Sequence, residues 1–244
     1  MAVPAVRRGT LRIYLGAAPG VGKTFAMLNE GRRRAARGTD VVVAVFETHG
    51  RERTEEQVGD LEVVPRHTLT HEGATFDEMD IDAVLARRPE LALVDELAHT
   101  NIPGSRHEKR WQDVDELLDA GIDVYTTLNV YQLESQMDAV SHLTGASVRG
   151  TIPDRYLDGS IHLELVDMPP QELIHRYQSG GIFIPKRMEM QMQKFFQDDH
   201  LFALRELTMR YVARRSNRFM RSLQNEPELT VPEAGAQRLL VCVS

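Results

Sequence analysis

The chain has 244 residues, 42% hydrophobic and 27% charged, which is typical of a globular protein with one or two domains. Its net charge of −7 argues against nucleic-acid binding, which usually requires a basic surface. The single cysteine, Cys242, excludes an internal disulfide and favours a reducing, cytoplasmic environment. We find no signal peptide and no apolar run of about 18 residues that could span a membrane.

Apolar runs and helical patterns alternate along the first two thirds of the chain. We expect strands at 12–15, 40–46, 91–94, 122–128 and 162–168, and helices at 23–37, 80–86, 113–121 and 131–143. The run DVVVAVF at 40–46 is continuously apolar, as in a strand buried on both faces. The pattern therefore predicts an α/β domain at 1–168, with a mostly parallel sheet and helices on both faces.

The pattern changes after Pro169 and Pro170. We expect a C-terminal helical extension at 169–224, with helices at 170–179, 186–196 and 201–223. Residues 225–237 have the composition of a linker, and RLLVCVS at 238–244 has the pattern of an apolar strand. A lone strand cannot bury itself, so we interpret it as the first strand of a further domain, cut off here. The alternative is a strand added to the edge of the sheet.

The segment between the first strand and the first helix has the pattern of a P-loop, with Lys and Thr at the start of the helix. Lys23 would reach the β- and γ-phosphates, and the Thr24 hydroxyl would bind Mg²⁺. The first position of the pattern usually carries glycine, but here it is Ala17, with Gly16 one residue earlier. The predicted nucleotide-binding residues are Pro19, Gly20, Val21, Gly22, Lys23, Thr24 and Phe25. The fold class predicted is thus P-loop NTPase-like.

Two acidic residues follow the strand at 91–94. Asp95 comes at the carboxyl end of that strand, where ligands bind in open parallel sheets, and we expect it to hold Mg²⁺. Glu96 follows directly and is placed to orient or deprotonate a water molecule. Lys23 and Glu96 are therefore the candidate catalytic residues, although Glu96 is equally consistent with a surface acid.

Other polar residues follow strands at the same predicted edge and are candidates for sensing the γ-phosphate. They are Glu47, Thr48 and His49, then His99, Thr100 and Asn101, and finally Thr126, Thr127 and Asn129. A basic loop follows His99, and its cations could neutralise charge in a transition state or simply be solvated. These cations are Arg106, Lys109 and Arg110.

Five stretches together resemble the N-terminal cytoplasmic domain of KdpD potassium sensor histidine kinases. They are GAAPGVGKT, VDELAHTN, GSRHEKRWQDV, LLDAGIDVYTTLNV and ALREL, within about 11–215. The resemblance implies ATP and Mg²⁺ as ligands, with the paired ATP motifs at Lys23-Thr24 and Asp95-Glu96. The family often has Gln-His where this chain has Tyr131-Gln132, so any role of that histidine is absent.

The resemblance also implies the context of the domain. In that family a universal-stress-protein-like domain follows, so 238–244 resembles its opening strand, and then come four membrane helices and a histidine kinase core. The implied partners are the rest of the sensor kinase and, through it, a response regulator. The implied location is the cytoplasmic side of a protein anchored in the bacterial inner membrane.

Two functions remain open from the sequence, since the intact Lys23, Thr24 and Asp95 argue against a third, a protein-interaction scaffold with a degenerate site. The first is a regulatory domain that binds ATP–Mg²⁺, with slow hydrolysis or none, in a potassium-responsive sensor kinase. The second is a free-standing P-loop kinase of nucleosides or nucleotides, in which Glu96 would activate an acceptor hydroxyl.

Overall fold

The computed structural model describes residues 7–47, 52–144, 150–158, 161–182, 192–193 and 195–224. The predicted linker at 225–237, the predicted strand at 238–244 and the candidate residues Thr48 and His49 lie outside these ranges, as does most of the predicted helix at 186–196. No helix in the described part of the chain combines the length and apolar character needed to cross a membrane.

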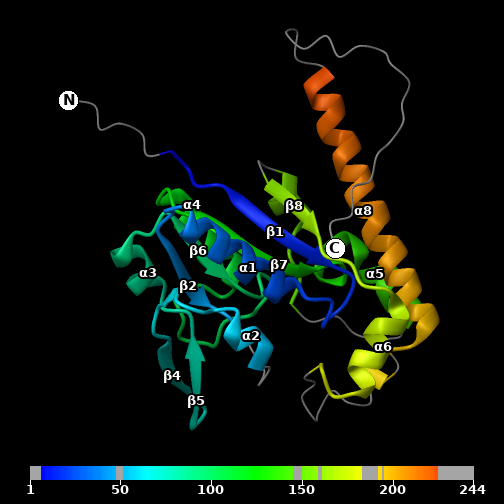
Figure 1. Cartoon of the computed structure of the whole chain (residues 1–244), viewed down its shortest axis with the longest axis horizontal. Coiled ribbons are helices and arrows are strands. Elements are labelled where there is room, and N and C mark those ends of the chain that lie inside the picture. The colour runs from blue at the N-terminus through cyan, green and yellow to red at the C-terminus, as the bar shows by residue number, and fades with distance from the viewer. Residues whose placement is uncertain are drawn as a thin grey trace.

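A six-stranded parallel sheet forms the centre of the molecule (Figure 1). Across the sheet the strands are β3 (Glu62–Val63), β2 (Val41–Val45), β6 (Leu91–Val94), β7 (Asp123–Asn129), β1 (Leu11–Gly16) and β8 (Ile161–Leu165). Because every pairing is parallel, the carboxyl ends of all six strands meet at one edge. β7 separates β1 from β6, and β8 lies on the other side of β1.

Helices cover both faces of this sheet. They are α1 (Lys23–Ala36) on one face and α3 (Ile81–Arg87) and α4 (Arg110–Asp119) on the other. A short helix, α2 (Glu52–Glu56), precedes β3. Ile13 packs in one hydrophobic cluster with Leu117 of α4, whereas its neighbour Tyr14 packs in another with Met27 of α1. Since adjacent strand residues face opposite ways, each strand contributes to two cores. The predicted fold class, a mostly parallel α/β sheet with helices on both faces, is confirmed, and it is consistent with a P-loop NTPase-like arrangement.

The helical extension adds α6 (Pro170–Gln178) and the long α8 (Asp198–Gln224). α8 packs against α6 and against α5 (Met137–Thr144). The extension shares a hydrophobic cluster with the loop that follows β1: Ala17, Ala18 and Val21 pack with Leu173 of α6 and Leu204 of α8. The loop after β1 is therefore part of the core that holds the extension.

The predicted helix at 131–143 is wrong in its first half. Two 3₁₀ turns, η1 (Val130–Gln132) and η2 (Glu134–Gln136), precede α5, and Leu133 between them is extended. Leu133 is fully buried and forms a parallel bridge with Ile152, which is buried too. Tertiary packing of one leucine thus overrides the helical pattern.

A β-hairpin that the sequence did not predict extends away from the main sheet (Figure 1). Its strands β4 (His67–His71) and β5 (Ala74–Glu78) pair antiparallel around Glu72 and Gly73, which both have positive φ, as in a two-residue hairpin turn.

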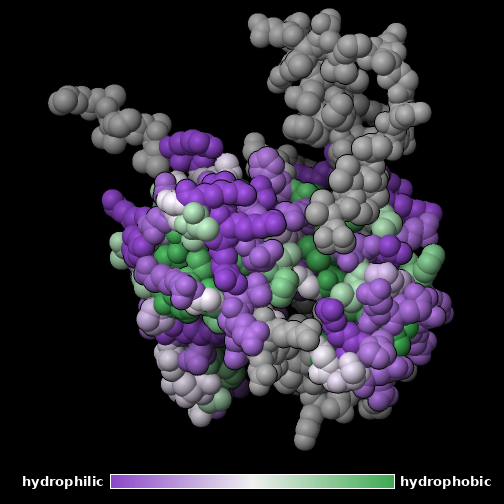
Figure 2. Space-filling view, in the orientation of Figure 1, coloured by the Kyte–Doolittle hydropathy of each residue, from purple (hydrophilic) through white to green (hydrophobic). Residues whose placement is uncertain are grey.

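A further 3₁₀ turn, η3 (Asp154–Asp158), precedes β8. In the view of Figure 2 most of the described surface is hydrophilic, with smaller hydrophobic areas.

Candidate functional site

The predicted phosphate loop lies between the end of β1 at Gly16 and the start of α1 at Lys23. Gly20 and Gly22 have φ values of 89° and 103°, a region that L-residues rarely adopt, so these turns require glycine. Gly22 occupies the N-cap position of α1, and its carbonyl accepts the N–H of Ala26. The structure therefore has the strand, glycine loop and helix that the sequence predicted.

The unusual alanine at position 17 has a packing role. Ala17 is 8% exposed and contributes its methyl group to the cluster shared with the helical extension. The preceding position, Gly16, has no room for a methyl group, because a Cβ there would lie 2.6 Å from Cγ2 of Val21. The glycine is thus needed at 16, and the alanine at 17 fills space in the core.

Lys23 reaches across the loop to the end of β7. Its Nζ donates to the carbonyl of Ala18 at 3.0 Å and to Oδ1 of Asn129 at 2.6 Å. Asn129 is held in turn by Gln132, whose Oε1 accepts both the backbone and the side-chain N–H of Asn129. The lysine ammonium is therefore fixed at the carboxyl edge of the sheet, where only 9% of the residue is exposed.

Thr24 and Asp95 are in direct contact. The Thr24 hydroxyl lies 3.0 and 3.2 Å from the two carboxylate oxygens of Asp95. Thr127 donates to Oδ1 of Asp95 at 2.5 Å, and the backbone N–H groups of Glu47 and Glu96 also donate to this carboxylate. The two residues predicted to bind a metal are thus brought together.

Asp95 is a buried carboxylate surrounded by these neutral donors. It is 1% exposed, and burial raises its pKa above the ordinary value. The nearby carboxylate of Glu96 raises it further, and the hydrogen bond from Thr127 opposes the shift. A divalent cation would favour the charged form that burial and Glu96 disfavour, so this environment fits a cation site.

The donor set also fits Mg²⁺ rather than an all-protein metal site. No group of three or more His, Cys, Asp or Glu side chains that could hold a metal occurs in the part of the chain that the structure describes. Mg²⁺ usually takes one or two carboxylates and completes its shell with water and phosphate oxygens. Asp95 and Thr24 are the residues that would hold such an ion.

Glu96 has an unusual backbone conformation. Its φ of 56° places a non-glycine residue in the left-handed region, which costs on the order of 1 kcal/mol and persists only where the surroundings impose it. Its N–H donates to both Asp95 Oδ1 and Thr127 Oγ1 at 3.1 Å. These contacts hold the turn after β6, and the Glu96 carboxylate is partly exposed at the sheet edge.

The strand order explains why these groups meet. β7 lies between β1 and β6, so Thr127 and Asn129 at its carboxyl end sit between Lys23 and Asp95. Of the predicted γ-phosphate sensors, these two are brought into the site. Glu47 contributes its backbone N–H, while its side chain pairs with Arg66.

The remaining predicted sensors within the described residues are placed elsewhere. Thr126 and Thr127 are adjacent in the strand, so their side chains point to opposite faces of the sheet. Thr126 is fully buried on the other face. His99 pairs with Glu78 at 3.0 Å, and Asn101 donates to Asp113 at 2.7 Å. Thr100 accepts a hydrogen bond from Lys109. The contacts of His99, Thr100 and Asn101 order the loop after β6, away from the Lys23–Asp95 pair.

The basic loop is ordered by ion pairs as well, and Arg110 is 2% exposed rather than solvated. Its Nη2 pairs with Glu78 at 3.2 Å, and its Nη1 donates to the carbonyl of Asp95 at 3.1 Å. Arg106 pairs with Asp82 and Glu116. Arg110 therefore supports the backbone of the acidic turn, a role that the sequence reading missed because Glu78 lies 32 residues away.

Glu78 is the centre of this buried network. Burial alone would raise its pKa, but the hydrogen bond and charge of His99, with the charge of Arg110, outweigh it and lower the pKa. Its Oε1 also accepts the N–H of Ile102. The hairpin end at Glu78 thus anchors both sides of the loop after Asp95.

The other side of the phosphate loop is held by the helical extension. Arg176 of α6 donates from Nη1 to the carbonyl of Gly20 at 2.7 Å. This contact joins residues 156 positions apart, and no sequence signal pointed to it.

Comparison with known proteins identifies the family. The family model described as "Osmosensitive K+ channel His kinase sensor domain", KdpD, matches residues 7–216. The chain belongs to the KdpD sensor-domain family.

Curated relatives agree with this assignment. The KdpD sensor protein of Escherichia coli K12 is 49% identical over 223 residues, which cover 91% of this chain and 25% of the relative. That of Mycobacterium tuberculosis H37Rv is 44% identical over 238 residues, 98% of this chain and 28% of the relative. That of Clostridium acetobutylicum is 44% identical over 210 residues, which cover 86% of this chain and 23% of the relative. This KdpD sensor domain thus spans about a quarter of the length of these relatives.

Proposed function

We propose that this KdpD sensor domain binds ATP–Mg²⁺ at the carboxyl edge of its sheet and acts as the regulatory nucleotide-binding part of a potassium-responsive sensor histidine kinase. The observation that carries the proposal is the contact between Thr24 and Asp95. It joins the glycine loop to a buried acid, and these are the two halves of a nucleoside triphosphate site with its metal.

The glycine loop supplies the phosphate contacts in this proposal. The backbone N–H groups from Gly20 to Phe25 belong to the loop and to the first turn of α1. At this end of the helix the dipole favours an anion. Phe25, in the first turn of α1, is 44% exposed, so this end of the helix lies at the surface of the described chain. Lys23, already fixed at the sheet edge by Asn129, would exchange that contact for phosphate oxygens.

Glu96 gives the site the means for slow hydrolysis. Its carboxylate follows the metal-binding acid on a strained turn and would orient or deprotonate a water molecule. Thr127 and Asn129 lie between the metal side and Lys23 and would contact the γ-phosphate. The nucleotide state would then be passed to a kinase core and a response regulator, as parts of a longer, membrane-anchored protein.

Calorimetric titration of the chain with ATP–Mg²⁺ tests the proposal. The Lys23→Ala variant should weaken binding by at least about tenfold, because a charge-assisted contact to phosphate is lost. Lys109→Ala is the matched control, since that ammonium donates to Thr100 away from the loop. Equal affinity of the wild type and Lys23→Ala would refute the phosphate-loop role.

A further inference from the structure

An open cavity of about 440 Å³, lined by exposed residues, runs along one face of α6 next to the phosphate loop. This volume is in the range of small-ligand sites. Its lining is polar and comes from residues that share one face of the helix, namely Gln171, Glu172, His175, Arg176 and Ser179. The opposite face of α6 carries Leu173, which is 2% exposed and packs in the cluster shared with the loop.

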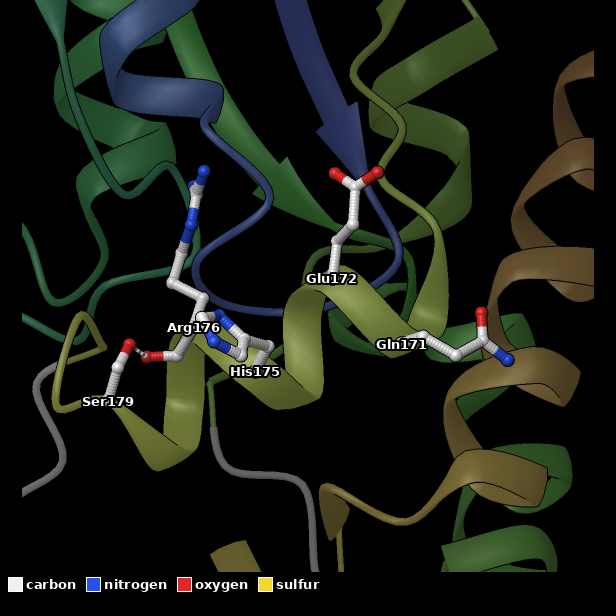
Figure 3. Close-up of a pocket in the computed structure, with 5 residues that line it drawn as sticks. All are labelled: Gln171, Glu172, His175, Arg176 and Ser179. Carbon is white, nitrogen blue, oxygen red and sulfur yellow. Dashed lines mark hydrogen bonds between the residues drawn. The ribbon is translucent and has the colours of Figure 1, made fainter.

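Arg176 connects this cavity to the loop. Its guanidinium donates to the carbonyl of Gly20 at 2.7 Å, and Figure 3 shows its side chain rising from α6 alongside the loop. Glu172 points from the same helix toward the loop, whereas Gln171 points toward α8 and donates to Asp198. The cavity and the loop therefore share a wall made by one arginine.

The topology fixes which end of a nucleotide would face the cavity. Lys23, Asp95 and Asn129 mark the γ-phosphate end, on the side of β1 that β7 and β6 occupy. β8 lies on the other side of β1, and α6 begins at Pro170 soon after β8 ends at Leu165. A triphosphate chain that starts at Asp95 and follows the loop leaves it on the α6 side.

We propose that this cavity holds the nucleoside part of the bound nucleoside triphosphate, an inference that rests on the proposed function. Arg176, held by Gly20, separates the phosphates from the nucleoside. Glu172 and Ser179 offer an acceptor and a hydroxyl for the ribose hydroxyl groups. The His175 ring offers a flat surface and a ring nitrogen for the base.

The test compares a complete nucleotide with its phosphates alone. Binding of ATP–Mg²⁺ and of tripolyphosphate–Mg²⁺ is measured by calorimetry for the wild type and for the double variant Glu172→Ala/His175→Ala. Both residues are exposed, so the variant should fold, which its thermal unfolding curve checks. We expect the affinity for ATP to fall by about tenfold and the affinity for tripolyphosphate to stay unchanged.

The control is Gln178→Ala, a change on the same helix at a residue that does not line the cavity, and it should leave both affinities unchanged. Unchanged affinity for ATP in the double variant would overturn the inference. Equal weakening of both ligands would also overturn it, since the residues would then act on the loop. If neither ligand binds the wild type, or if Lys23→Ala binds both equally well, the proposed function itself fails and this inference with it.

Discussion

Nζ of Lys23 donates a 2.6 Å hydrogen bond to Oδ1 of Asn129, so the first residue of α1 is tied to the last residue of β7. The contact exists because β7 is inserted between β1 and β6, which brings its carboxyl end beside the loop. In the proposed site, this contact would position the ammonium before a phosphate binds. Such preorganisation reduces the entropy lost on binding.

Replacing this partner should weaken nucleotide binding without removing it. In Asn129→Ala the lysine keeps its contact with Ala18 but loses the side chain that aligns it toward the sheet edge. We expect the affinity for ATP–Mg²⁺ to fall by about tenfold, because the proposed contact of Asn129 with the γ-phosphate is lost together with the alignment of Lys23. Calorimetry measures it, and an unchanged affinity would show that Asn129 does not position Lys23.

The acidic side of the site should control the dependence on Mg²⁺. In Asp95→Asn the carboxylate charge is lost while the shape is kept, so the gain in ATP affinity that Mg²⁺ provides should largely disappear. The measurement is ATP affinity with Mg²⁺ and with a chelator, for both proteins. If Asp95→Asn retains the full Mg²⁺ effect, the metal is held elsewhere.

The neighbouring positions 16 and 17 provide a matched pair of one-methyl changes. Ala17→Gly removes a methyl group from the cluster shared with the helical extension, so stability should fall by about 1 kcal/mol while ATP affinity is kept. Gly16→Ala adds a methyl group that would lie 2.6 Å from Val21 Cγ2. It should lower both stability and ATP affinity, because the loop must shift. Denaturant unfolding and calorimetry measure the two effects.

Much of this site could be predicted because its signals are local. The loop from Gly16 to Thr24 and the acid at Asp95 each follow an apolar strand, and the parallel fold places such ends together. The hairpin that ends at Glu78 could not be predicted, because its strands are mostly exposed and have no apolar alternation. The contacts Glu78–Arg110 and Arg176–Gly20 depend on tertiary packing, which no short pattern encodes.

The buried pair of Glu78 and Arg110 should matter for stability and its pH dependence. Glu78→Gln leaves the Arg110 guanidinium buried without its counter-charge, and we expect a loss of about 3–5 kcal/mol. Asp40→Asn, which removes an exposed partner of Arg87, is the control and should destabilise the fold far less, because an exposed ion pair contributes little to stability.

The sign of the pH effect follows from the lowered pKa of Glu78. In the folded protein the carboxylate stays charged at a pH where the unfolded chain already binds a proton. The stabilisation from this pair is therefore complete above the ordinary glutamate pKa of about 4.3. It is lost as the pH falls from that value through the lower pKa that Glu78 has in the folded protein. The free energy of unfolding is measured from about pH 3 to about pH 7, a range chosen around that pKa. It should decrease less steeply toward low pH in Glu78→Gln than in the wild type. An identical slope in both proteins would contradict the assignment.

In the proposed site, Glu96 is the residue that would activate water for hydrolysis of the nucleotide. Glu96→Gln keeps the size of the side chain but removes the base, so release of phosphate from ATP should fall by about a hundredfold while ATP affinity changes little. Glu47→Gln is the matched control, because that acid also follows a strand at this edge but its side chain pairs with Arg66. The same rate in Glu96→Gln and in the wild type would exclude Glu96 as the base. No release above background in the wild type would leave a domain that binds ATP without hydrolysing it, and the strained turn at Glu96 would then serve only to hold Asp95 in place.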